Sequence, residues 1–215
     1  MENIITDLKL SKRRQGWVNV YLDHCFAFTV DLLEAAALSK GQVLNTELVT
    51  RMRGKHEGHS AYVCAIRYLS HRMRSRKEID RYLYKRRGFA RETIAIVIKR
   101  LTEERYLDDK EFARLFVEGR IRSRPRSRAF LRHELSQKGI DDDVIVAVLG
   151  KVDDENLAWR SIEGKLKHWV KLDRPDFKKR IVGFLQRRGF SLSIALNAYQ
   201  HACSLNNRDD GPRYD

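Results

Sequence analysis

The sequence predicts a mainly α-helical protein in which three tandem three-helix repeats form an elongated, curved array, preceded by a small antiparallel β-sheet segment with short helices. Two observations support this fold class. A basic phrase that ends in glycine and an apolar residue recurs around positions 88, 139 and 189, at intervals of 51 and 50 residues. Apolar residues then follow each glycine at the three- and four-residue spacing of a buried helix face.

The first 58 residues are the β-rich part of this prediction. Short runs of alternating apolar and polar residues at 4–10, 17–22 and 26–30 indicate three antiparallel strands joined by tight connections. Residues 32–38, which contain three alanines, and residues 46–52 favour two short helices. We expect residues 54–58, with a glycine at each end, to form a hinge between this extension and the repeats.

The rest of the chain divides into repeats at 59–107, 108–152 and 153–203, followed by a disordered tail at 204–215. Paired aspartates open the second and third repeats, at 108–109 and 153–154, and aspartate before an apolar helix is a typical N-cap. Pro125 and Pro175 fall in connections, where a missing backbone N–H costs least. The weaker apolar face after Gly189 suits a repeat that caps the array.

Each repeated glycine is predicted to end a helix. Glycine reaches positive φ without a Cβ clash, and a preceding arginine or lysine suits the negative end of the helix dipole. The apolar residue that follows should fold back against the helix it has just left. The predicted structural corners are therefore Gly88, Gly139 and Gly189.

The positive charge of the chain is concentrated in one region. The formal net charge is +14, and residues 61–138 contain 22 Lys and Arg against 10 Asp and Glu. A solvated helix face is the ordinary explanation for a run of charge, but such faces usually mix both signs. The excess therefore favours an anionic partner, either nucleic acid or an acidic protein surface. The predicted basic face for partner or DNA binding consists of Arg67, Arg72, Arg74, Arg76, Arg81, Arg86, Arg87, Arg122, Arg124, Arg126, Arg128 and Arg132.

Signatures of catalysis are weak. The sequence has no GxxxxGK(S/T) phosphate loop, no HExxH and no CxxC pair, and its seven histidines are scattered. The paired aspartates lack a recurring third ligand, so we expect no metal site. With the phosphate-loop and catalytic motifs also missing, we expect no cofactor and no enzymatic activity. The cysteines at 25, 64 and 203 indicate reduced, mostly buried thiols. Without a secretory signal or an apolar run of ~20 residues, we expect a cytoplasmic monomer that makes no membrane contact.

Four segments in series carry a resemblance to a known family. They are residues 65–78, 106–113, 134–140 and 185–190. Together they resemble, in order and in spacing, the RecX family of bacterial recombination regulators over about residues 60–200. Residues 18–23 and 38–41 are similar to the amino-terminal extension of longer members. No single segment is diagnostic, but the series is.

The resemblance implies a protein that binds the RecA recombinase, chiefly as its filament on single-stranded DNA, and that suppresses ATP hydrolysis and strand exchange. Members of the family are described as lying in the helical groove of the filament. An array of similar modules provides a physical reason for binding along the filament groove, because weak contacts to successive protomers reinforce one another through effective concentration.

Two other functions are compatible with the same features. Three-helix units with a glycine in the turn also resemble helix-turn-helix modules, so the chain could bind single-stranded or double-stranded DNA directly. The helix after Gly88 is largely apolar, however, and offers few side chains suited to base edges. A helical-repeat scaffold for some other acidic protein is the third possibility.

Overall fold

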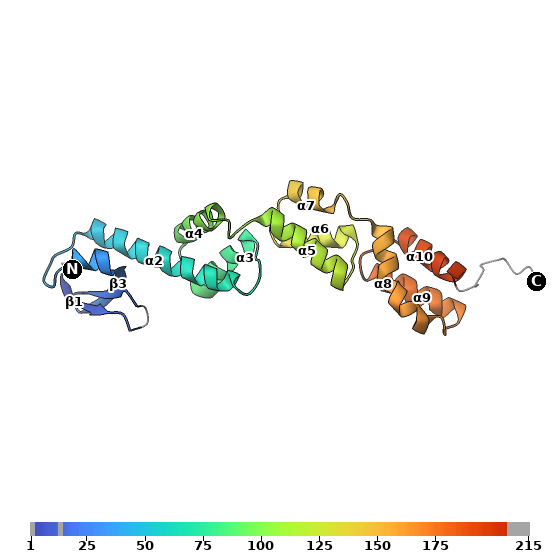
Figure 1. Cartoon of the computed structure of the whole chain (residues 1–215), viewed down its shortest axis with the longest axis horizontal. Coiled ribbons are helices and arrows are strands. Elements are labelled where there is room, and N and C mark those ends of the chain that lie inside the picture. The colour runs from blue at the N-terminus through green and yellow to red at the C-terminus, as the bar shows by residue number, and fades with distance from the viewer. Residues whose placement is uncertain (1–2, 13–14, 206–215) are drawn as a thin grey trace, which may run out of the picture. The chain divides into compact units, whose positions relative to one another are not determined.

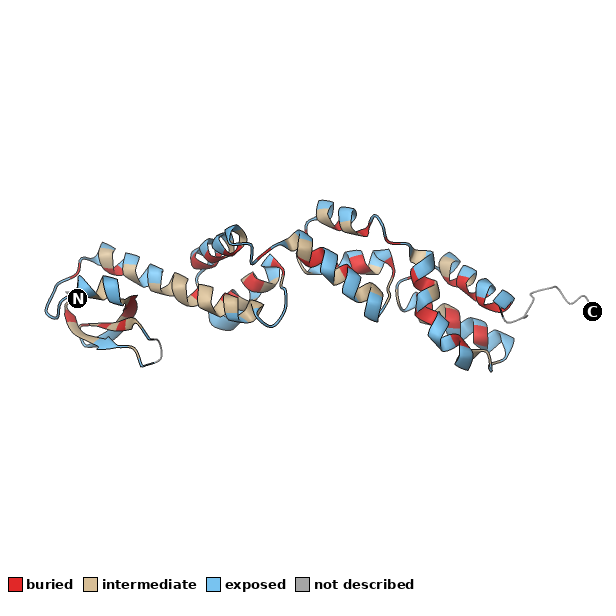
Figure 2. Cartoon of the chain, in the orientation of Figure 1, coloured by how far each residue is buried: buried red, intermediate tan, exposed pale blue. Residues whose placement is uncertain are grey.

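The computed structural model describes residues 3–12 and 15–205 of the chain. It forms two compact units, Met1–Leu107 and Asp108–Asp215, which are considered separately below (Figure 1). The predicted mainly α-helical class with a small amino-terminal sheet is confirmed, since within the described residues a three-stranded antiparallel sheet is followed by helices. Buried residues, red in Figure 2, occur on the helices of both units.

The sheet of the first unit has the order β1-β2-β3, with strands Ile5–Leu10, Trp17–Leu22 and Cys25–Asp31. Asp23 and His24 both have positive φ, the geometry of a tight hairpin whose twist matches that of its strands. Alternate residues of β2 are buried, as expected for a sheet with one covered face. The short helix α1, Leu32–Ala36, follows β3, and its first turn is capped by Asp31.

The hinge expected at residues 54–58 is wrong, because helix α2 runs without a break from Thr46 to Leu69. The domain boundary drawn at residue 58 therefore falls inside a helix. The physical reason is that α2 packs against the sheet and also against the next core. The His59 ring lies 4.3 Å from the Trp17 ring, centroid to centroid, and Ala61 is fully buried in the next core. Tertiary contacts of this kind override the local preference of glycine.

The first three-helix module uses the second half of α2 together with α3, η1 and α4. Helix α3, Arg76–Arg81, continues directly into the π-helical turn η1, Tyr82–Arg86, and α4 spans Arg91–Glu103. Ser75 and Glu78 form a reciprocal capping box at the start of α3. The core of the module consists of Ala61, Ala65, Ile79, Leu83, Ile94, Val97, Leu101 and Leu107.

The second unit contains the other two modules. Helices α5 (Asp109–Ser123), α6 (Arg128–Gln137) and α7 (Asp142–Leu149) form one, and α8 (Asp154–Trp169), α9 (Arg174–Gln186) and α10 (Leu192–Leu205) form the other. A single hydrophobic core runs through both modules. As predicted, Asp108 and Asp153 cap α5 and α8, each accepting two backbone N–H bonds.

The three repeated glycines have φ values of +73°, +76° and +86°, the left-handed region that the cap prediction requires. At Gly139 and Gly189 the glycine N–H donates to the carbonyl three residues back, at 2.9 Å. The N–H of the next residue donates to the carbonyl five residues back, at 3.2 Å. This is the Schellman arrangement, and it buries Ile140 and Phe190 beneath the helices they follow.

The corner at Gly88 is built differently. There the glycine N–H donates to Tyr84 O, four residues back, and the Phe89 N–H donates to Leu83 O, six residues back. Each bond spans one residue more than its counterpart, because η1 is wound as a π-turn. Ser75 and Gly88 are separated by one residue more than the corresponding Ser127 and Gly139. The π-turn therefore absorbs an inserted residue without moving the corner.

Three smaller expectations also need correction. Pro175 lies in the first turn of α9 and not in the preceding connection. A backbone N–H in that turn has no partner within the helix, so a proline there removes no helical hydrogen bond. Cys25 is exposed, so the thiols are less uniformly buried than expected. The predicted tail begins too early, because residues 204 and 205 belong to α10. The remainder of that tail lies outside the described residues.

Candidate functional site

The first module has a pocket beside the π-turn, which we call the Tyr68–Tyr82 pocket. Tyr68 on α2 stacks on Tyr82 of η1 with ring centroids 4.0 Å apart. The pocket has a volume of about 610 Å³ and is lined by Tyr68, Glu78, Arg81, Tyr82, Lys85 and Arg86. The cations of the pocket can bind the phosphates of a nucleic-acid strand or the carboxylates of an acidic peptide.

Two arginines of the predicted basic face hold the first module together. Arg72 makes a paired hydrogen bond with the Glu78 carboxylate, at 3.0 and 3.1 Å, and also donates to Met73 O at 2.8 Å. The Arg74 guanidinium lies 4.0 Å from the centroid of the Tyr68 ring, and its buried Nε has no hydrogen-bond partner within the described chain. Both guanidiniums are therefore committed to the fold around the α3 N-cap.

The remaining arginines predicted in this module differ in accessibility. Arg87 donates to Cys64 Sγ at 2.9 Å, and this hydrogen bond raises the pKa of the guanidinium. Arg76 is exposed in the first turn of α3. Arg67, Arg81 and Arg86 are exposed, and within the described chain no carboxylate pairs with them. These three are the most available for an external anion.

In the second module the predicted arginines lie from the last turn of α5, across the connection, into α6. Arg122 and Arg124 are exposed, and the Arg126 guanidinium lies 4.0 Å from the Phe130 ring centroid. Arg128 donates to Val152 O at 2.6 Å. Arg132 forms a 3.4 Å ion pair with Asp142. The structure therefore leaves Arg122, Arg124 and Arg126 without a carboxylate partner in the described chain and uses the other two for contacts within the unit.

Sequence reasoning missed Arg188. Its guanidinium donates to Pro125 O at 2.9 Å and lies 4.4 Å from the Phe184 ring centroid. Burial lowers the pKa of Arg188, and repulsion from Arg126 and Arg124 lowers it further. Arg188 stands in the repeated basic corner, so the signal was present in the sequence, but its contact with residue 125 cannot be inferred from spacing.

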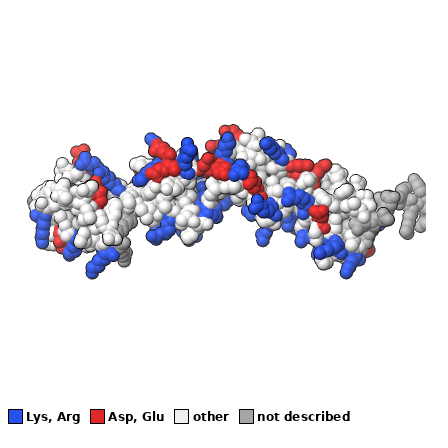
Figure 3. Space-filling view, viewed as in Figure 1, with Lys and Arg blue, Asp and Glu red and all other residues white. Residues whose placement is uncertain are grey.

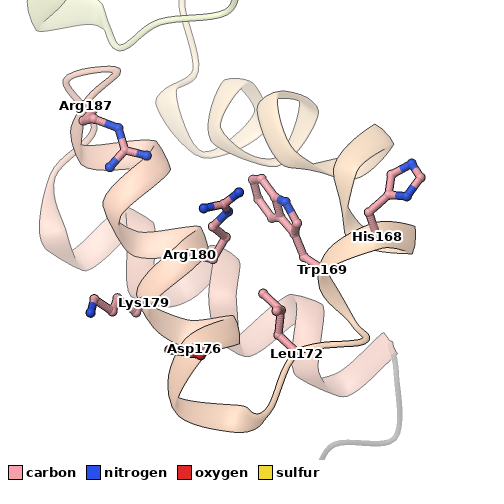
Figure 4. A pocket seen from close by; sticks show the side chains of 7 residues that line it. All are labelled: His168, Trp169, Leu172, Asp176, Lys179, Arg180 and Arg187. Atoms are coloured by element: carbon pink, nitrogen blue, oxygen red, sulfur yellow. The ribbon is translucent and has the colours of Figure 1, made fainter.

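A second pocket, which sequence reasoning also missed, lies in the third module between α8 and α9. It has a volume of about 650 Å³ and is lined by His168, Trp169, Leu172, Asp176, Lys179, Arg180 and Arg187 (Figure 4). The Trp169 indole and the Arg180 guanidinium point toward each other across it. One carboxylate among several cations makes the pocket suited to an anionic group.

Carboxylates accompany many of the cations. On the face seen in Figure 3, lysine and arginine side chains lie among aspartate and glutamate side chains. Several are paired along a helix, as where Arg114 contacts both Glu111 and Glu118 on α5. The local excess of charge is thus partly neutralised. What stands out is the small set of guanidiniums that no carboxylate of the described chain neutralises.

The described residues include no group of three or more His, Cys, Asp or Glu arranged to hold a metal ion. In the same part of the chain, no helix has the length and apolar character needed to cross a bilayer.

Comparison with known proteins points to a single family. A model of the first three-helix domain of RecX matches residues 61–101, and a model of the second matches residues 108–149. Regulatory protein RecX of Bacillus licheniformis is 34% identical over 212 residues, covering 96% of this chain and 80% of the relative. That of Bacillus subtilis is 34% identical over 195 residues, covering 88% and 74%. A crystal structure of regulatory protein RecX superposes with a TM-score of 0.65 at 25% identity, covering 89% of this chain and 96% of that one.

Proposed function

The chain belongs to the RecX family, and from this premise we propose that it binds the RecA recombinase and its filament on single-stranded DNA. In doing so it inhibits ATP hydrolysis and strand exchange in recombination and DNA repair. It acts in the cytoplasm as a monomer, without a cofactor and without catalysis of its own.

The unneutralised guanidiniums on successive modules are the observation that carries this proposal. Arg81 and Arg86 stand at the Tyr68–Tyr82 pocket, and Arg122 and Arg124 stand on the next module, all of them exposed. A repetitive polymer of protein and DNA presents acidic groups at regular intervals, so each module can make a weak contact of the same kind. Linked weak contacts add up to tight binding through effective concentration.

Charge reversal at the exposed arginines tests this proposal. In the Arg81→Glu/Arg86→Glu variant, two cations become anions where no hydrogen bond within the described chain is lost. RecA ATPase on single-stranded DNA is measured while the protein is titrated in. We expect wild-type protein to suppress hydrolysis and the variant to need roughly tenfold more protein for the same effect, the size of a loss of ~1.4 kcal/mol.

A matched control separates the surface from the total charge. Arg51 and Arg53 are two exposed arginines on α2 that lie outside the predicted basic face. The Arg51→Glu/Arg53→Glu variant changes the net charge equally and should inhibit like wild type. Equal inhibition by all three proteins would refute the role of the Tyr68–Tyr82 pocket. Failure of the wild-type protein to affect RecA would refute the proposed function itself.

Direct reading of a DNA groove by the helix after the glycine corner is disfavoured. On α4, Ile94, Val97 and Leu101 face the core, and Ile96 is 68% exposed on the outer surface. An isoleucine offers no hydrogen bond to a base edge. The helix that would have to read the sequence is therefore used for packing.

A further inference from the structure

Arginine occupies every second position from 120 to 128, from the end of α5 across the connection to the first residue of α6. The two ends of this series are engaged within the unit. Arg120 makes a paired hydrogen bond with Glu134, at 2.8 and 3.1 Å, and Arg128 donates to Val152 O. The three arginines between them have no carboxylate partner within the described residues. The ends thus hold in place a segment whose central charges are unpaired.

The corner at the end of α9 adds a fourth guanidinium. Arg188 donates from its side chain to Pro125 O at 2.9 Å, and its own carbonyl accepts the Ser127 N–H at 3.1 Å. A Cβ on Gly189 would lie 2.6 Å from Ser127 Oγ, so the two segments are in close contact. The third module therefore adds a cation to the α5–α6 connection of the second module. The backbone contact between Arg188 and Ser127 fixes the position of that cation.

This arrangement places like charges together at an energetic cost. Arg124 and Arg126 lie close enough to Arg188 that their charges, added to the effect of burial, lower its pKa. Arginine nonetheless stays charged at neutral pH. Arg126 and Arg188 also contact the rings of Phe130 and Phe184, and these contacts favour their present positions. Guanidiniums that repel one another yet are fixed in place form a preorganised site for an anion.

We propose that Arg124, Arg126 and Arg188 form a phosphate-binding site for the backbone of a nucleic-acid strand, at the contact between the second and third modules.

The number of the cations favours a strand over a single carboxylate. One carboxylate has two oxygens, and one guanidinium fork can occupy both, as the Arg120 and Glu134 pair shows. Arg124 and Arg126 stand two residues apart in the connection, and the bond to Pro125 O brings Arg188 to the same segment. Three guanidiniums are therefore offered together, and a phosphate backbone, which carries one charge per nucleotide, can engage all of them.

This inference deepens the proposed function, because it names the surface that would contact the strand within a filament. It rests on that function only for the choice of single-stranded DNA. Binding can be measured on bare oligothymidylate without RecA, so a failure of the site and a failure of RecA inhibition are separate results.

The test is fluorescence anisotropy of a labelled oligothymidylate at low salt. Arg124→Gln removes an exposed cation that makes no contact needed by the fold, and Arg188→Gln removes the cation from the third module. Each should bind roughly five- to tenfold more weakly and should flatten the slope of log affinity against log salt by about 0.7. Arg160→Gln, an exposed arginine on α8 outside the site, controls for net charge and should bind like wild type.

Competition identifies the ligand chemistry. An unlabelled oligothymidylate should displace the probe far better than inorganic phosphate or a polyglutamate peptide of equal charge, and a strand with neutral methylphosphonate linkages should not compete. Two results would overturn the proposal. One is wild-type affinity in both Arg124→Gln and Arg188→Gln, and the other is equal competition by polyglutamate, which would make the site one for acidic protein.

Discussion

Substitution of Gly189 by alanine should destabilise the second unit more than a glycine corner alone can explain. The φ of +86° disfavours any residue with a Cβ, at a cost of about 1–2 kcal/mol. The added methyl would also lie 2.6 Å from Ser127 Oγ and 3.0 Å from Phe130 Cβ. Overpacking of this kind adds about 1–3 kcal/mol, giving an expected loss of about 2–5 kcal/mol in the free energy of unfolding.

The same chain supplies its own comparisons. Gly88 has a similar φ of +73°, but a Cβ there would meet no atom within 4 Å. Gly88→Ala therefore isolates the conformational cost in the first unit. Gly164 lies exposed within α8, also with open space around it. Gly164→Ala should stabilise the second unit by about 0.5–1 kcal/mol, because glycine is a poor helix former.

Differential scanning calorimetry of the full chain is the assay. For a unit of about 100 residues, each kcal/mol shifts the melting temperature by ~4–8 °C, so Gly189→Ala should lower its transition by about 10 °C or more. Gly88→Ala should lower the transition of the first unit by less. If the two losses are equal, the close contact between the glycine corner and the second module is absent and the reasoning is wrong.

Three further predictions concern local structure. The double variant Gly54→Ala/Gly58→Ala should raise the stability of the first unit by about 1–2 kcal/mol in chemical denaturation, whereas a flexible hinge would give no gain. Asp153→Ala should cost about 1 kcal/mol through loss of the α8 cap and Asp153→Ser should restore it, so equal stability of all three proteins would exclude the cap. A thiol reagent should modify exposed Cys25 rapidly and buried Cys203 only on unfolding, as read by mass spectrometry of the peptides.

Features with a local physical cause could be predicted from the sequence. The glycine corners follow from the steric freedom of glycine, and the caps at Asp108 and Asp153 follow from the unpaired N–H groups of a first turn. The strands follow from alternation of apolar residues. In each case the interacting groups lie within a few residues of one another, so spacing alone carries the information.

Features that depend on distant contacts could not be predicted. Helix α2 continues through two glycines because His56 and His59 pack on the rings of the sheet, which no local pattern reveals. Arg74 looked like a free surface cation, yet it covers the Tyr68 ring. Arg188 meets Pro125 across a sequence separation of 63 residues. Composition located the basic region, but only the fold distinguishes cations that are available from those already paired.

Binding to RecA filaments at physiological salt tests the proposed function most directly. The protein is sedimented with RecA assembled on single-stranded DNA, and in parallel with the same DNA without RecA, while the salt concentration is raised. Contacts to phosphate alone weaken steeply over this range. We expect the protein to remain with the filament at salt concentrations where it has left the bare strand. Equal loss from both would show that the DNA, and not the recombinase, is what the protein binds.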